Sequence, residues 1–275
     1  MDEFLRLFTY GFFQKALLAA LFTSISAGIT GTYIVSRRIV FIGGGITHAS
    51  FGGIGLAFLL GFNPLLGAAL FAVLTAYGIQ FFSDRVHIRE DSSIAIWWSL
   101  GMALGVIFVF LTPGYTPNLM SYLFGNILTV RTSELWAMLL LLILLCAFFA
   151  RWYREILYIA FDEEFARASG IPVRFFNYSL MTLIALVMVM NIRAVGIILI
   201  LSLMTVPQAT ANLFTRDFRI MMLLSVVFAF CGTFTGLILS YFLNIPSGAA
   251  IIFTLILAFA LFKLLKREKW SHARR

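Results

Sequence analysis

FIGGGITHASFGGIGLAFLLG, residues 41–61, is long enough to cross a bilayer as a helix, which takes about 20 mostly apolar residues. Its one titratable side chain is His48. Helical spacing places Gly44 one turn before His48 and Gly52 one turn after it, so the imidazole shares its face with glycines. A glycine face lets a second backbone approach closely. His48 is therefore expected to face protein, or a narrow path through it, rather than lipid.

The spacing alone leaves two roles open for this histidine. An ionisable residue within a membrane segment is a functional candidate, which would place His48 on a transport path. A polar side chain at this depth can instead hold two helices together through a hydrogen bond.

The composition indicates a membrane protein. Of the 275 residues, 61% are hydrophobic and 12% are charged, against about 25% charged residues in a soluble domain. We therefore predict an all-α fold, a polytopic helix bundle with about eight to nine transmembrane helices in a single domain. The net charge is +8, but the basic residues cluster between apolar runs, as they do beside a lipid membrane. No basic face with exposed aromatic residues is apparent, so no nucleic-acid partner is expected.

The basic residues also orient the chain. If the turn at Arg37 is cytoplasmic, most of the 20 basic residues fall on the cytoplasmic side, as the positive-inside rule requires. The residues that fall outside are Arg6, Lys15, Arg131 and Arg193. This orientation places the C-terminus in the cytoplasm and the N-terminus outside.

Two segments depart from uninterrupted spans. Residues 195–212 are predicted to span after a brief exit at residues 191–193, but Pro207 must kink or break that helix beside the polar Gln208. Interrupted helices at membrane depth often line a substrate path, although a kink can also serve packing alone. Residues 118–131 are too polar for a span and are expected to lie at an interface or to re-enter the membrane.

The longest polar stretch, residues 151–174, is predicted to be a cytoplasmic loop that contains a short helix in FDEEFARASGIPV. Asp162, Glu163 and Glu164 complement the positive N-terminal end of a helix. Gly170 suits its C-terminal end. Such a helix can serve as a handle for a soluble partner, and the alternative is an ordinary connecting loop. The other polar loop, residues 83–92, has acidic and histidine side chains at a metal-binding spacing, but its arginines favour a solvated loop.

Sequence motifs of enzymes are absent. No GxxxxGK[ST] phosphate loop is present, so the chain is not expected to bind ATP by that route. Neither HExxH nor GxSxG occurs. We therefore expect a transporter or channel and not an enzyme.

Taken together, these blocks resemble the permease subunits of ABC transporters that import divalent transition metals. The similarity covers nearly the whole chain. It is carried by ALLAALFTSISAGITGTYIVSRR (16–38), FIGGGITHASFGGIG (41–55), REDSSIAIWWSLGMALGV (89–106), SYLFGNILTV (121–130), FDEEFARASGIPV (161–173) and RAVGIILILSLMTVPQATA (193–211).

The resemblance implies a homodimer in a bacterial inner membrane, with the translocation path at its two-fold axis. A cytoplasmic ATPase subunit would bind the ATP, and an extracytoplasmic metal-binding protein would deliver the ion. The transported ion would be zinc, manganese or iron, with no tightly bound cofactor.

The resemblance also assigns roles to residues of the His48 helix. The family motif G-D-x-x-x-H places His48 at the family histidine and Gly44 at the family aspartate, so this chain lacks that carboxylate. His48, with Thr47 beside it, is the expected transient metal site. Pro207 and Gln208 are further candidates for the path.

The family coupling motif, E-x-A-x-x-x-G, matches Glu164, Ala166 and Gly170. This match makes the short helix, with Asp162 and Glu163 at its start, the expected docking point of the ATPase. Two alternatives remain. Because Gly44 replaces a carboxylate, the substrate could be a metal chelate and not a free ion. A transporter or channel that works without ATP would leave the coupling motif unexplained.

Overall fold

The computed structural model describes residues 9–272 apart from 87, 114–124 and 126, and all regular elements in that part are helices. Eight of them are long and apolar enough to cross a membrane, which confirms the predicted polytopic bundle. They are α2 (Gly11–Ser36), α3 (Phe41–Leu60), α4 (Pro64–Val86), α5 (Glu90–Leu111), α7 (Thr132–Arg151), α10 (Val173–Val195), α13 (Phe218–Leu243) and α14 (Ser247–His272).

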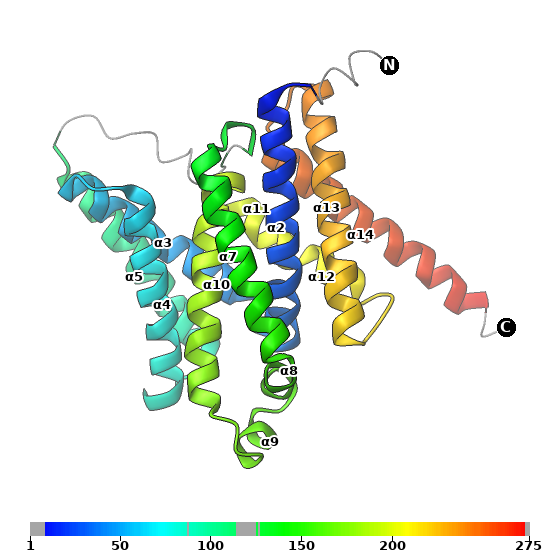
Figure 1. The fold of residues 1–275 in the computed structure, drawn as a ribbon, viewed down its shortest axis with the longest axis horizontal. Coiled ribbons are helices and arrows are strands. Elements are labelled where there is room, and N and C mark those ends of the chain that lie inside the picture. The colour runs from blue at the N-terminus through cyan, green and yellow to red at the C-terminus, as the bar shows by residue number, and fades with distance from the viewer. Residues whose placement is uncertain (1–8, 87, 114–124, 126, 273–275) are drawn as a thin grey trace.

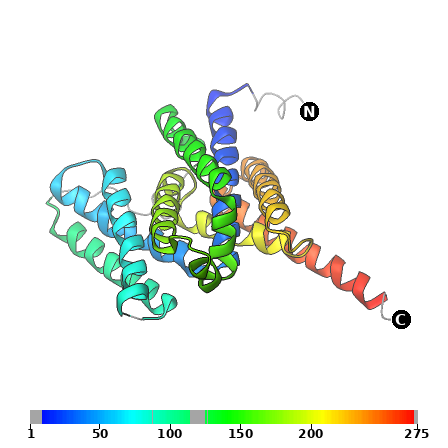
Figure 2. The ribbon, with the colours of Figure 1, turned by 60° about the horizontal axis from the view of Figure 1, so that its bottom comes forward.

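The long helices are arranged in three groups (Figure 1). α3, α4 and α5 pack together on one side, and α2, α7, α10 and α13 form the middle of the bundle. α14 leans away on the opposite side, as Figure 2 also shows. Two short helices, α8 (Tyr153–Phe161) and α9 (Glu163–Ala168), lie at the end of the bundle opposite to the start of α2.

Glycines hold α3 against both of its neighbours. A Cβ atom on Gly52 would lie 2.8 Å from the carbonyl oxygen of Gly101 on α5. On the other side of α3, a Cβ atom on Gly53 would approach the carbonyl oxygen of Gly67 on α4 more closely still. Neither glycine of α3 has room for a side chain, so the close backbone approach expected from the sequence is present.

The path of α10 corrects one prediction. The polar residues at 191–193 predict an exit from the membrane, but α10 continues through them to Val195. Asn191 is buried, and its amide oxygen accepts a hydrogen bond from the Thr23 hydroxyl at 3.0 Å, while its amide nitrogen donates to the Ser26 hydroxyl at 3.0 Å. α2 therefore satisfies this amide inside the bundle, where water is not needed.

The predicted interruption near Pro207 is confirmed. α10 is followed by Gly196, with φ 82°, and then by two short helices, α11 (Ile197–Leu203) and α12 (Val206–Ala211). The break lies at residues 204–205, just before the proline. Pro207 itself lies in the first turn of α12. Backbone N–H groups in a first turn have no acceptor within the helix, so the missing N–H of proline costs no hydrogen bond there.

The predicted interfacial or re-entrant segment at 118–131 lies mostly outside the described residues. Its described part includes the short 3-10 helix η1 (Ile127–Thr129), whose Ile127 is buried in the core. The backbone N–H of Arg131 then donates to the Glu134 carboxylate at 2.9 Å, which fixes the start of α7.

Candidate functional site

His48 lies on the face of α3 that meets α5, and a tryptophan covers its ring. The imidazole stacks on the indole of Trp98, with ring centroids 4.5 Å apart and ring planes 6° from parallel. The Nδ1 atom is buried and has no hydrogen-bond partner within the described residues. The second role considered for this histidine, a hydrogen bond that joins two helices, is therefore not seen in the described part of the chain.

Gly44 lies under the same indole. A Cβ atom at this position would be 3.1 Å from Cζ3 and 3.3 Å from Cη2 of Trp98, which is tighter than an ordinary contact. The position that the resemblance assigns to an aspartate is thus a glycine whose adjacent space is filled by an aromatic ring. The sequence predicts a small face on α3 but cannot show which residue of another helix fills it.

Thr47 is buried and bonded within its own helix. Its hydroxyl donates to the carbonyl oxygen of Gly43 at 2.6 Å and lies 3.1 Å from that of Gly44. Among the residues the structure describes, no group of three or more histidine, cysteine and acidic side chains is placed to hold a metal ion. In the described part of the chain, His48 therefore belongs to no such group.

Gln208 braces α12 against α2. The side chain is fully buried, and Nε2 donates to the carbonyl oxygen of Ala27 at 2.8 Å and to that of Leu203 at 3.2 Å. Gly31 makes room for this amide, since a Cβ there would lie 2.7 Å from the Gln208 Cδ. Pro207 beside it is also buried. The contacts of Gln208 are thus with α2 and α11, whereas those of His48 are with α5, and the structure does not bring the two together.

The predicted short helix in the polar stretch is present as α9. The Asp162 carboxylate caps it by accepting from the Phe165 N–H at 2.9 Å, and Gly170 follows its end with φ 80°. Ala166 is fully buried against Ile159 of α8. The residues on its outer face are exposed, and they include Glu164 and Phe165.

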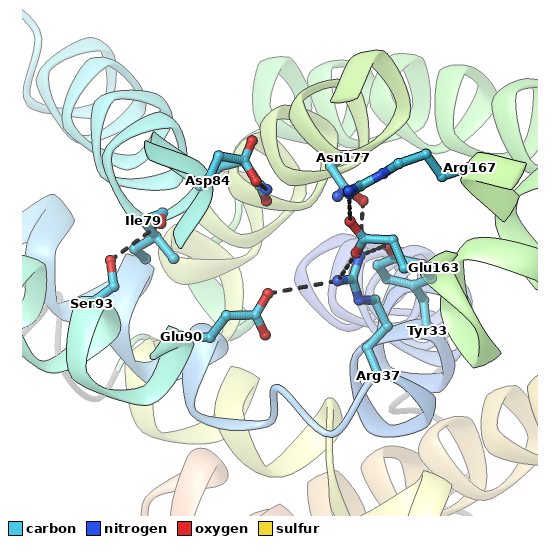
Figure 3. Close-up of polar contacts among 10 residues, drawn as sticks. Tyr33, Arg37, Ile79, Asp84, Glu90, Ser93, Glu163, Arg167 and Asn177 are labelled. Carbon is cyan, nitrogen blue, oxygen red and sulfur yellow. Dashed lines mark hydrogen bonds and ion pairs between the residues drawn. The ribbon is translucent and has the colours of Figure 1, made fainter. Parts of the chain in front are cut away.

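Glu163 turns inward from α9 and meets Arg37, the residue that follows α2 (Figure 3). The Nη2 atom of Arg37 lies 2.8 Å from the Glu163 carboxylate and 3.6 Å from the Glu90 carboxylate at the start of α5. Nη1 donates to the side-chain oxygens of Asn177 on α10, at 2.8 Å, and Tyr33, at 3.2 Å. Burial acts to lower the pKa of the guanidinium, but Tyr33 and the two carboxylates outweigh it and hold the pKa above its ordinary value.

We call this group, formed by Tyr33, Arg37, Glu90, Glu163 and Asn177, the Arg37 cluster. It joins four elements, α2, α5, α9 and α10, at the same end of the bundle. The sequence alone predicts Arg37 only as a basic residue of a cytoplasmic turn. The sequence does place a polar residue, Asn177, near the start of an apolar helix, which indicates a buried polar contact. Nothing in the sequence identifies Arg37 as its partner.

Comparison with known proteins now identifies the family. A model of the ABC 3 transport family matches residues 9–266. The chain belongs to this family. It is 37% identical over 253 residues to the manganese transport system membrane protein MntC of Listeria innocua, covering 92% of this chain and 90% of that protein. It is 34% identical over 260 residues to the manganese import system permease protein ScaB of Streptococcus gordonii, covering 94% and 93%.

A solved structure agrees with these relatives of the ABC 3 family. PsaBC from Streptococcus pneumoniae, in complex with Fab, superposes with a TM-score of 0.83 and 33% sequence identity, covering 95% of this chain and 94% of that chain. The resemblance seen in the sequence is therefore confirmed, and the chain is a metal ABC transporter permease.

Proposed function

We propose that two copies of this chain form the translocation path of an ATP-driven importer of divalent transition-metal ions in a bacterial inner membrane. A separate ATPase docks on α9, and an extracytoplasmic metal-binding protein delivers the ion at the opposite end. The main support for this proposal is the match, over nearly the full chain, to permeases whose names specify manganese transport. The end with α9 is cytoplasmic, with the C-terminus, and the N-terminus lies outside, so the broken segment α11–α12 makes a further crossing beside the eight long helices.

The shape of α9 supports ATPase docking. Its inner side is anchored by the buried Ala166, and Glu164 and Phe165 are exposed on its outer side. A hollow of about 310 Å³, lined by residues including Arg167 and Pro172, adjoins it. Movement of α9 reaches the membrane helices through the Arg37 cluster, because Glu163 is bonded to Arg37. A partner that pushes on α9 can thereby bias the bundle between two states.

The His48 face supports a dimer. His48 and Trp98 are only partly buried in one chain, so a second copy can approach this face. A dication in a low-dielectric site needs more than one ligand, and a two-fold axis would supply a second imidazole. Weak holding by two imidazoles suits a path that must release the ion it binds.

One observation favours a second candidate substrate. Gly44 and the indole above it leave no carboxylate beside His48, so a chelated metal, which carries its own ligands, is the alternative cargo.

The test is uptake by vesicles that contain the chain with its ATPase and binding protein. Zn²⁺, Mn²⁺ and Fe²⁺ are supplied separately, and ATP hydrolysis is followed in parallel. We expect ATP-dependent uptake of at least one ion, lost in His48→Ala and retained in His272→Ala, a matched change at the far end of α14. Complex assembly is checked for both variants.

The other outcomes separate the alternatives. ATP hydrolysis that responds to the binding protein without uptake of any free ion would favour the chelate. Uptake that proceeds in vesicles without the ATPase would overturn the proposal in favour of a channel.

A further inference from the structure

Trp98 reaches His48 because α5 lies unusually close to α3. A Cβ on Gly45 would lie 2.5 Å from the side chain of Ile94, and one on Gly52 would lie 2.8 Å from the Gly101 carbonyl oxygen. Trp98 is one helical turn from both Ile94 and Gly101, on the same face of α5. Its indole is therefore held between two close contacts, directly over the turn of α3 that carries His48.

The indole and the helix contact limit how an ion could be bound at this turn. It covers one face of the imidazole. It fills the space beside Gly44, where a side chain one turn from His48 would lie. The Nδ1 atom is buried and has no hydrogen-bond partner in the described part of the chain. The Thr47 hydroxyl is fully buried, so Nε2 is the ligand atom that we assign to this turn among the described residues.

The ligand chemistry of such a site is distinctive. Mn²⁺ is a hard ion that is suited by carboxylate, carbonyl and water oxygens, whereas Zn²⁺ accepts imidazole nitrogen. A neutral imidazole also supplies no negative charge to a dication in a low-dielectric site. A site of imidazole and indole therefore lacks what Mn²⁺ needs most.

We propose that Trp98 is a specificity-determining residue, which makes the His48 turn an imidazole site for nitrogen-accepting ions such as Zn²⁺ and excludes the carboxylate that would favour Mn²⁺. This inference rests on the proposed function, in which free metal ions pass His48. It sets the chain apart from the relatives whose names specify manganese.

The test compares ion preference among variants, because almost any site of nitrogen and oxygen ligands binds Zn²⁺ above Mn²⁺. Gly44→Asp, Trp98→Ala and the double variant are assayed for the ratio of Zn²⁺ to Mn²⁺ uptake in the complete transporter. In the double variant a carboxylate fits beside His48, and we expect the ratio to shift toward Mn²⁺ by about tenfold or more, as large as the effect of one metal-binding partner. Gly44→Asp alone should lower all uptake with little change in the ratio, because the indole blocks the carboxylate.

The decisive quantity is how far the shift in the Zn²⁺-to-Mn²⁺ uptake ratio in the double variant exceeds the sum of the shifts in the two single variants. If Gly44→Asp alone shifts the ratio as far as the double variant does, or if the double variant leaves the ratio unchanged, Trp98 does not determine specificity. A transporter that moves no free ion in any variant would instead contradict the proposed function.

A second measurement works without transport. Cu²⁺ accepts imidazole and quenches indole emission at short range, so its addition to the purified complex should quench tryptophan fluorescence. The quenching should be lost in His48→Ala and reduced in Trp98→Phe. Zn²⁺, which also accepts imidazole, should reverse it. Quenching that is unchanged in His48→Ala would overturn the inference.

Discussion

The Arg37 guanidinium donates to the Glu163 carboxylate at 2.8 Å and so ties the end of α2 to the helix proposed to dock the ATPase. The Arg37 side chain is 10% exposed and that of Glu163 is 28% exposed, so water screens this pair less than a surface ion pair. The contact lies where force from the partner would enter the membrane helices.

Replacing Arg37 by glutamine should uncouple ATP hydrolysis from transport. The amide keeps a polar group near Asn177 but cannot hold two carboxylates, so α9 would move without carrying α2. We expect metal uptake per ATP hydrolysed to fall about tenfold, within the usual range of coupling free energies. The control is Arg89→Gln, whose side chain is 85% exposed and pairs with Asp91 at the same end of the bundle. Equal effects of the two changes would show that general charge, and not the Arg37 contact, matters.

Two changes in α9 should separate anchoring from docking. Ala166→Leu overfills a fully buried position, which costs about 1–3 kcal/mol, and should lower both thermal stability and co-purification of the ATPase. Glu164→Ala changes an exposed side chain and should weaken co-purification alone. Normal ATPase retention in both variants would place the docking surface elsewhere.

Asn191→Leu should destabilise the bundle. It removes both hydrogen bonds of Asn191 to α2 and leaves the Thr23 hydroxyl without this acceptor, while the Ser26 hydroxyl keeps its bond to the Thr23 carbonyl oxygen. The expected loss is about 1 kcal/mol, the size of such bonds between membrane helices. Thr182→Val is the matched control, because that hydroxyl bonds only within α10, to the Tyr178 carbonyl oxygen. Unfolding of the permease in lipid nanodiscs measures both, and a similar melting temperature for the two variants would contradict this account.

Gln208→Ala tests whether Gln208 holds α12 on α2 or lines the transport path. If the amide serves to hold α12 on α2, its loss should lower stability by about 1–2 kcal/mol and reduce uptake of all ions alike. A path residue would instead change the ratio between ions and leave the melting temperature unchanged. Uptake and thermal unfolding, measured on the same preparation, decide between these roles.

The sequence predicted the parts of the fold that local chemistry controls. The lengths of the apolar runs predicted the spans, and Pro207 predicted the broken helix. The acidic residues 162–164, followed by Gly170, predicted α9. The sequence could not show that Asn191 is buried, because a polar residue in an apolar run looks the same whether it meets water or the hydroxyls of α2.

The candidate site was predicted less completely, for a related reason. His48 and its glycine neighbours follow from the period of one helix. Trp98 lies on a different helix, and its place over Gly44 depends on how far α5 approaches α3. The partners of Arg37 are likewise distant in the chain, 126 residues away in the case of Glu163.

The glycines that bring α3 so close to its neighbours also affect how the protein is made. Of the eight long helices, α3 has the lowest mean hydropathy, 1.3, and the largest buried share, 78%. Glycine, threonine and histidine contribute little to partitioning into lipid, so α3 is poorly retained in a bilayer on its own. α3 and α4, joined by the short turn at residues 61–63, are therefore expected to leave the translocon as a hairpin. The helix that carries His48 thus depends on its neighbours for membrane insertion as well as for packing.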